Sequence, residues 1–338
     1  MQPDLQRQFF ERIKMRIAPH LNMVDEIGDL LSIGSDSVYR RMRGDTALTL
    51  EEAIQLANKF HISLDTLRDM DAQRVDFDAG PVIASADDYQ KYTSRILHQM
   101  LAFQQSREEM HMTYAALDFP LFYIFLFPNV ARLKSYYWGR SILGLPEFKA
   151  ITYQQFLIPE ERRALAEEIV TAYIGLNSTE LWSSTCYLST LKQVQLYWET
   201  GVFTQADEAL SVLNDLDRLL DYLVAQSECG RKINPATGQP VGGSFAWYIT
   251  DLQVGQNVAY MEKPSGDQTF LSYNSFNFLE TTHPYFTQQT KKWMDELLTK
   301  STLATGSGQA QRDKYVGKLR KQVDAIRRLV VEAEDTIL

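Results

Sequence analysis

The sequence predicts a mainly α-helical protein with more than one domain, and three observations lead to this prediction. The chain has 338 residues, 45% of them hydrophobic and 12% aromatic, which is enough to bury more than one core. Over most of its length apolar residues recur at three- and four-residue steps, as on one face of a helix. The pattern changes to strand-like alternation only between residues 245 and 273. We therefore expect an N-terminal domain of five short helices, a long connecting helix, and a larger, mostly helical α+β domain with a small antiparallel sheet.

The first three helices of the N-terminal domain follow from apolar spacing and from residues that begin or end helices. The first carries an apolar stripe at four-residue intervals, which comprises Leu5, Phe9, Ile13 and Ile17. Pro19 ends it, and Asn22 is placed to cap a second helix that ends near Ser32. A small turn at residues 33–35 leads into a third helix over residues 35–42, with Val38 and Met42 on its buried side.

The last two helices of this domain begin at residues that can cap a helix. Thr49 and Glu52 have the spacing of a capping box at the start of a fourth helix. Ser63 is placed to cap a final turn that contains Leu64 and Leu67. Residues 1–70 are therefore expected to form the first domain.

The stretch from Ile27 to Gly44, with the sequence IGDLLSIGSDSVYRRMRG, resembles the helix-turn-helix of the XRE, or lambda-repressor-like, family. Residues 48–50 and 62–67 resemble the closing helices of that family, and residues 37–44 are also similar to its BetR-type subgroup. Three positions depart from the usual pattern: Gly28 replaces an alanine, Ser32 replaces the turn glycine, and Met42 replaces an acidic residue. The resemblance implies a five-helix lambda-repressor-like domain that binds double-stranded DNA.

The resemblance also implies that the third helix lies in the major groove with its N-terminal side chains at the base edges. The candidates for base contacts are Ser35, Asp36, Ser37, Tyr39 and Arg40. An arginine can bond guanine with two hydrogen bonds, and a serine can bond several bases, whereas Arg41 or Arg43 is expected to hold phosphates. The alternative is that these arginines form a solvated face of an ordinary helical bundle, or that the bundle binds protein.

The charge of the chain is unusual for a protein that binds DNA, because phosphate contacts require lysine and arginine. The net charge is −9, and residues 1–70 contain nine Lys and Arg against eleven Asp and Glu. Three of those arginines, however, are concentrated at Arg40, Arg41 and Arg43. A face that is locally positive is therefore still expected on the third helix.

Residues 71–117 are expected to connect the two larger domains. Residues 71–85 lack a helical period and contain Gly80 and Pro81, which is typical of a linker. Residues 86–116 contain neither glycine nor proline and carry a helical stripe that comprises Tyr89, Tyr92, Ile96, Met100, Phe103, Met110 and Tyr114. This stripe resembles a heptad seam interrupted at Arg107. Two interpretations remain open: the helix pairs with a second subunit in a homodimer, or it packs on the second domain of its own chain.

Residues 118–338 are expected to form a regulatory, sensor or oligomerisation domain. The aromatic block at residues 119–128 could line a ligand pocket, although aromatic density more often belongs to a core, which we favour. Helices are expected over residues 159–174, 178–200, 204–229, 284–300 and 309–331, and strands over residues 245–249, 257–261, 269–273 and 302–305.

The residue types that carry catalysis or bind metals do not occur in the necessary spacings. Cys186 and Cys229 stand far apart, and no histidine lies in a metal-binding or catalytic motif. We therefore expect no enzymatic activity, no metal and no cofactor. The longest apolar run, residues 119–127, is too short to span a bilayer, and no signal pattern precedes the first helix, so a cytoplasmic protein without a membrane partner is expected.

The function that the sequence predicts is a sequence-specific, DNA-binding transcriptional regulator. A C-terminal domain would dimerise and sense a small-molecule or protein effector. Two other functions remain open: a protein-interaction or assembly factor that is docked by its N-terminal domain, and an enzyme with a DNA-binding domain attached. Fold alone does not decide between them.

Overall fold

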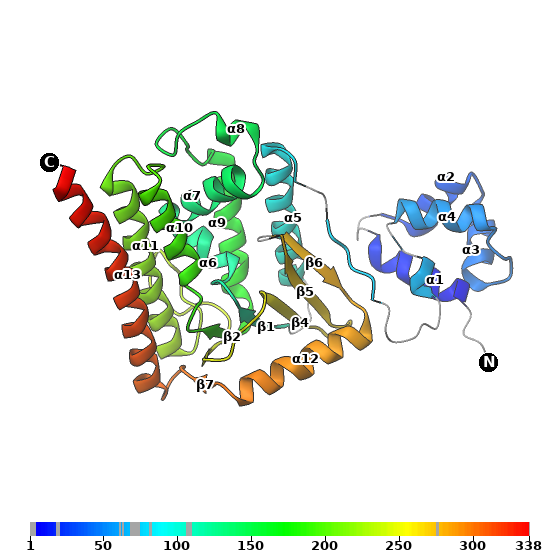
Figure 1. Cartoon of the computed structure of the whole chain (residues 1–338). Coiled ribbons are helices and arrows are strands. Elements are labelled where there is room, and N and C mark those ends of the chain that lie inside the picture. The colour runs from blue at the N-terminus through cyan, green and yellow to red at the C-terminus, as the bar shows by residue number, and fades with distance from the viewer. Residues whose placement is uncertain are drawn as a thin grey trace. The chain divides into compact units, whose positions relative to one another are not determined.

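The computed structural model describes residues 5–17, 21–60, 62, 64–67, 75–80, 83–105, 110–274 and 277–337. The chain divides into two compact units, Met1–Asp76 and Phe77–Leu338, which we call the N-terminal and C-terminal units (Figure 1).

The N-terminal unit consists of short helices around a single core. Its elements are α1 (Leu5–Arg16), α2 (Met23–Leu31), α3 (Ser35–Arg43), α4 (Leu50–Lys59) and the 3-10 helix η1 (Leu64–Leu67). The core comprises Phe9, Phe10, Ile13, Val24, Ile27, Val38, Leu56, Ala57 and Phe60. These bounds agree with the five helices expected from the sequence, except that the last is a 3-10 turn. Pro19 and Ser63 lie outside the described residues.

Two of the predicted helix caps are confirmed by their hydrogen bonds. The side chain of Asn22 accepts a hydrogen bond from the backbone N–H of Val24 at 3.0 Å. The Thr49 hydroxyl accepts from the Glu52 N–H at 3.1 Å, and the Glu52 carboxylate accepts from the Thr49 N–H at 3.0 Å. Each cap satisfies a backbone N–H that has no partner within its own helix.

The C-terminal unit contains most of the helices and all of the strands of the described chain. Its helices are α5 (Ala86–Gln105), α6 (Leu121–Leu126), α7 (Pro128–Tyr137), the π-helix η2 (Trp138–Ile142), α8 (Pro146–Lys149), α9 (Glu160–Gly175), α10 (Leu188–Glu199), α11 (Ala206–Cys229), α12 (Pro284–Thr299) and α13 (Gln309–Ile337). Its strands are β1 (His111–Ala116), β2 (Asn177–Ser183), β3 (Phe245–Thr250), β4 (Val258–Glu262), β5 (Gln268–Tyr273), β6 (Asn277–Thr281) and β7 (Thr302–Leu303).

The strands form one mixed sheet of seven strands in the order β6-β5-β4-β1-β2-β3-β7. The central pairs β1–β2 and β2–β3 are parallel, and the pairs on either side are antiparallel. Parallel neighbours need a long crossover, and helices α6 to α9 and then α10 and α11 supply the two crossovers here.

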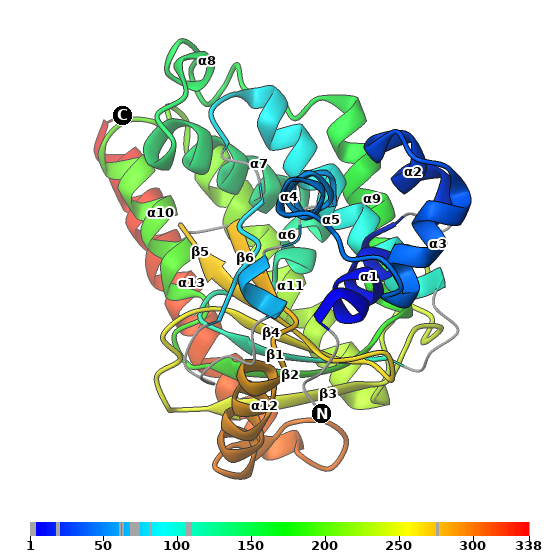
Figure 2. The ribbon, with the colours of Figure 1, turned by 90° about the vertical axis from the view of Figure 1, so that its right-hand side faces the viewer.

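The two faces of the sheet are covered unequally. Figures 1 and 2 show α5, α6, α9, α11 and α13 on one side of the sheet and α12 on the other. The large core on the first side includes Tyr123, Trp182 and Trp247. The small core under α12 includes Tyr260 and Met294.

The expectation of a small antiparallel sheet is therefore wrong, although a mainly helical class with some strands is shown. The strands expected near residues 245, 257, 269 and 302 are present, but β1, β2 and β6 were missed. β1 and β2 lie in the middle of the sheet and pair in parallel, which requires contacts between distant parts of the chain. Local spacing in the sequence does not contain that information.

Two expected helices are also corrected. The helix expected over residues 86–116 ends at Gln105, and His111–Ala116 is strand β1. The helix expected over residues 178–200 is strand β2 followed by α10. The apolar stripe from Tyr89 to Phe103 packs into the core of the C-terminal unit. Of the two interpretations of this helix, the structure therefore has the one in which it packs on the second domain of its own chain.

Candidate nucleic-acid interface

Helix α3 presents one exposed face that contains five of the seven residues predicted to contact DNA. These five are Ser35, Asp36, Tyr39, Arg40 and Arg43, and all are exposed. At 100° per residue they span about 140° of the helix circumference. Ser37 and Arg41 lie outside this face, about 60° and 100° beyond its edge at Arg40, and are half-buried. We call these five residues the α3 stripe.

The opposite side of α3 holds the helix in the core of the N-terminal unit. Val38 is fully buried and Met42 packs against the same core. The backbone between α2 and α3 turns at Ser32, which has a left-handed conformation with φ of 54°. At Gly28 of α2, a Cβ atom would lie 3.0 Å from the carbonyl oxygen of Ile33. The orientation of the stripe is therefore fixed by a close approach of α2 to the turn and by buried apolar contacts.

Arg41 is engaged in an ion pair within the protein. Its Nη2 lies 2.8 Å from Glu52 Oε1 and its Nε lies 3.2 Å from Glu52 Oε2, so the two side chains meet through two hydrogen bonds. The hydrogen bond from Arg41 is the main cause that lowers the pKa of Glu52. Glu52 also belongs to the capping box of α4. Arg41 therefore joins α3 to the start of α4, which is a positioning role that the sequence did not reveal.

Arg40 and Arg43 differ from Arg41 in their surroundings. Within the part of the chain that the structure describes, the Arg40 guanidinium makes no hydrogen bond or ion pair. Arg43 pairs with Asp45 at 3.0 Å, but both side chains are more than half exposed. Exposed pairs of this kind contribute little to stability and can exchange partners easily. Arg40 and Arg43 are thus the basic side chains of the α3 stripe that can contact an anion.

Gln6 of α1 fixes the end of α3 and the loop that follows it. Its amide group donates to the carbonyl oxygens of Arg41 and Thr46, each at 2.7 Å, and its side-chain oxygen accepts from the Leu48 N–H at 2.9 Å. Arg7 donates to the carbonyl oxygen of Arg43 at 2.7 Å. Sequence reasoning missed both residues because these bonds join positions more than 34 residues apart.

The aromatic block at residues 119–128 belongs to the core of the C-terminal unit, as favoured from the sequence. Phe119, Tyr123 and Phe127 are buried. Leu121 and Phe122 also line a cavity beneath α5, so one edge of the block faces an open space.

A buried polar cluster lies behind the sheet of the same unit. The ammonium group of Lys232 is fully buried, donates to the carbonyl oxygen of Tyr173 at 2.9 Å, and lies 3.4 Å from the centre of its ring. Burial lowers the pKa of Lys232 to about 7, and the nearby carboxylate of Glu180 opposes that shift. Glu180 accepts hydrogen bonds from Tyr173, Ser178 and Trp182. A polar pair with so many internal partners is a feature of the core that residue spacing did not indicate.

The described residues include neither a metal-binding cluster nor a membrane-spanning helix. No group of three or more His, Cys, Asp or Glu side chains among them could hold a metal ion. None of the described helices is both long and apolar enough to cross a membrane.

No protein-family model matches the chain, and no curated protein or solved structure is significantly similar to it.

Proposed function

We propose that the chain is a sequence-specific DNA-binding transcriptional regulator of the cytoplasm. In this proposal the N-terminal unit binds double-stranded DNA, and the C-terminal unit supports a homodimer and senses an effector. The observation that supports it most is the α3 stripe: polar and basic side chains share one exposed face of a short helix whose other side is fixed in a core.

Each residue of the stripe has a role that its chemistry allows. Arg40 is exposed and can donate two hydrogen bonds to guanine in the major groove. Ser35, Asp36 and Tyr39 lie nearer the N-terminus of the helix, which enters the groove in helix-turn-helix complexes. Asp36 can accept from the amino group of cytosine and would be repelled by phosphates, which favours a base contact over a backbone contact.

The roles first expected for Arg41 and Ser37 change with this geometry, whereas those of Arg40 and Arg43 stay as they were. Arg43 is exposed at the end of α3 and is assigned to a phosphate. Arg41 is assigned to positioning, because it binds Glu52 and also donates to the backbone carbonyl oxygen of Ser37 at 3.3 Å. Ser37 is half-buried and lies outside the α3 stripe, so it is no longer assigned to a base.

We also propose that two N-terminal units bind DNA together, because a single α3 stripe offers few phosphate contacts. The chain carries a net charge of −9, so nonspecific attraction to DNA is weak. Two units held by a dimer would contact two half-sites about one helical turn apart, and their affinities would combine.

The experiment that tests this function is selection of binding sites from a pool of random duplex DNA at fixed salt, followed by sequencing. The wild type is expected to enrich a repeated or palindromic site, and Arg40→Ala is expected to lose that enrichment. Arg328→Ala is the matched control, because Arg328 is also exposed but lies on α13 of the other unit. Enrichment by Arg40→Ala equal to the wild type, or binding of all sequences alike, would contradict the proposal.

A further inference from the structure

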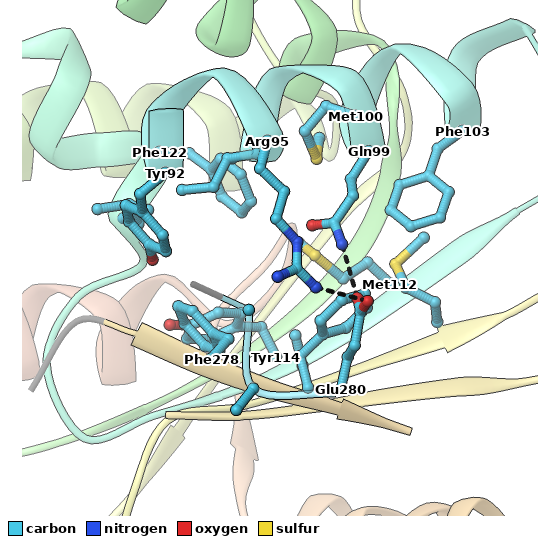
Figure 3. Close-up of a pocket in the computed structure, with 17 residues that line it drawn as sticks. Tyr92, Arg95, Gln99, Met100, Phe103, Met112, Tyr114, Phe122, Phe278 and Glu280 are labelled. Atoms are coloured by element: carbon cyan, nitrogen blue, oxygen red, sulfur yellow. Dashed lines mark hydrogen bonds and ion pairs between the residues drawn. The ribbon is translucent and has the colours of Figure 1, made fainter. Parts of the chain in front are cut away.

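A cavity of about 90 Å³ lies in the C-terminal unit between α5 and the neighbouring face of strands β1, β4, β5 and β6 (Figure 3). Most of its wall is apolar and includes Phe103, Met112, Phe122, Met261, Phe270 and Phe278. Methionine side chains are flexible and polarisable, so such a wall can adapt to the shape of a ligand.

The charged groups at the cavity are already paired with one another. Glu280 accepts hydrogen bonds from Arg95 at 2.8 Å, from Gln99 at 2.6 Å and from Gln268 at 3.3 Å. Arg95 also lies 3.5 Å from Asp78, so one positive charge faces two negative charges. An anionic ligand would meet excess negative charge, and a cationic ligand would have to displace Arg95 from Glu280. The cavity therefore favours an uncharged ligand.

One polar group in the wall remains available for a ligand. Tyr114 lines the cavity and is only 2% exposed, and its hydroxyl makes no hydrogen bond to any residue that the structure describes. Burial raises the pKa of Tyr114 well above its ordinary value, so the hydroxyl keeps its proton near neutral pH. A ligand with one hydrogen-bonding group could satisfy it.

The connector from the N-terminal unit forms another part of the wall. Asp78 and Glu280 exchange two backbone hydrogen bonds, of 2.8 and 2.9 Å, at the edge of strand β6. Ala79 and Gly80 line the cavity. Gly80 has φ of +65°, and a Cβ atom there would lie 2.1 Å from Nη1 of Arg95. These residues follow the boundary between the two units at Asp76 directly.

We propose that this cavity is a ligand site for a small uncharged molecule, either a single aromatic ring or a short alkyl chain that carries at most one hydrogen-bonding group. Its occupancy stabilises residues 78–80 of the connector. We infer the ligand site from the cavity alone. Because residues 78–80 directly follow the N-terminal unit, a bound ligand is also expected to change DNA affinity, and this second step rests on the proposed function of that unit.

The size of the cavity sets the size of the ligand. An apolar cavity of roughly 150 Å³ stays dry and admits benzene. The present cavity, at about 90 Å³, admits one ring after a small adjustment of its methionines, or a chain of a few carbons. A larger molecule could place only one apolar end in it.

The first test is a ¹⁹F NMR titration of the full chain with 4-fluorophenol as the probe. Saturable binding is expected for the wild type. Ala259→Leu fills the cavity from β4 and should abolish that binding, whereas Ala236→Leu, the same change at an exposed loop, should retain it. Absence of saturable binding to the wild type, or unchanged binding to a folded Ala259→Leu variant, would overturn the proposal.

A second variant tests the site without filling it. Tyr114→Phe keeps the ring and removes the hydroxyl, so affinity for 4-fluorophenol should fall by about 2- to 10-fold, as for one net hydrogen bond. Fluorobenzene has no hydroxyl group to bond to Tyr114, so its affinity should change much less. An equal change for both probes would contradict the assignment of Tyr114.

The coupling is tested by hydrogen exchange and by DNA affinity with and without 4-fluorophenol. Slower exchange of the Asp78 and Glu280 amides is expected on binding, together with a change in affinity for the selected DNA. Unchanged exchange at saturating probe would overturn the role of the connector. If no specific DNA binding occurs at all, the proposed function fails, and the titration still decides the ligand site.

Discussion

Replacement of Arg41 by alanine should destabilise the N-terminal unit by about 1 to 2 kcal/mol, and this magnitude follows from the geometry of one ion pair. The Arg41 and Glu52 side chains are 15% and 19% exposed and share two hydrogen bonds. Exposed pairs contribute about 0 to 1 kcal/mol, and hydrogen bonds to charged groups about 1.5 to 3 kcal/mol. This pair lies between the two cases because it is shielded from solvent but not fully buried.

The same pair gives the effect of Arg41→Ala a defined pH dependence. Arg41 lowers the pKa of Glu52 in the folded state, so the unfolded chain binds a proton at this site more readily. The stabilisation is therefore complete above the unfolded pKa of about 4.3 and is lost as pH falls through the lower folded value. The difference between wild type and Arg41→Ala should be largest at pH 7 and shrink below about pH 4.

The assay is hydrogen exchange of the α3 and α4 amides in the full chain, because all five tryptophans lie in the C-terminal unit and fluorescence would not report on these helices. Arg43→Ala is the control: its partner Asp45 is 52% exposed, so the change should cost less than about 0.5 kcal/mol. Wild-type protection of α3 and α4 in Arg41→Ala at pH 7 would refute the reasoning. So would an effect that grows as the pH falls.

Three further predictions concern single residues. Ser32→Gly should stabilise the N-terminal unit by about 0.5 to 1 kcal/mol, because glycine has no Cβ atom to clash at the left-handed φ of 54°. A lower midpoint of thermal unfolding for this unit in the variant would contradict the prediction. Burial lowers the pKa of Lys232 in the folded state below its unfolded value, so the unfolded chain holds this proton more readily. The free energy of unfolding of the wild type should therefore rise by up to about 1.4 kcal/mol per pH unit above pH 7. Lys232→Met should remove that slope, as measured by urea titrations at several pH values. Parallel slopes for the two proteins would rule this out. Cys186 is buried, which raises its pKa to about 12, whereas Cys229 is exposed. A thiol reagent should therefore modify Cys229 alone in the native protein and both cysteines after unfolding. Modification of both cysteines in the native protein would contradict this prediction.

The N-terminal unit could be predicted well because its signals are local. Asn22, Thr49 and Glu52 cap helices through bonds that span two or three residues, so their spacing alone indicates where a helix begins. Val38 was correctly placed on the buried side of α3 from the apolar period. The departure at Ser32 also proved informative, because the turn still adopts the conformation that usually favours glycine.

The C-terminal sheet was predicted poorly because its central strands depend on long-range contacts. In β1, Met112 and Tyr114 face the large core while Ala115 faces the smaller one, yet the same segment also fits a continued helical stripe. Residues 177–183 of β2 are mostly polar, and Glu180 is buried only because Tyr173 and Trp182 donate hydrogen bonds to it. Neither pattern identifies a strand until its neighbours are known.

The candidate site was predicted in its residues but not in all of its roles. Helical periodicity placed Tyr39 and Arg40 outward, as the structure has them. It did not show that Arg41 is bound within the protein and is not available to a phosphate, because its partner Glu52 lies on the next helix. The cavity beneath α5 could not be predicted from the sequence either, because its wall combines Gly80, Tyr114 and Glu280 from distant segments of the chain.

The central claim is that Arg40 of the α3 stripe contacts a base edge, and the most direct test is a change of specificity. Arg40→Gln and the wild type would be selected in parallel from the same random duplex pool at the same salt concentration. Since arginine bonds guanine and glutamine bonds adenine, the variant should prefer adenine at one position of each half-site and leave the other positions unchanged. An unaltered consensus that is bound more weakly at every site would instead assign Arg40 to the phosphate backbone, and no consensus for either protein would contradict the account.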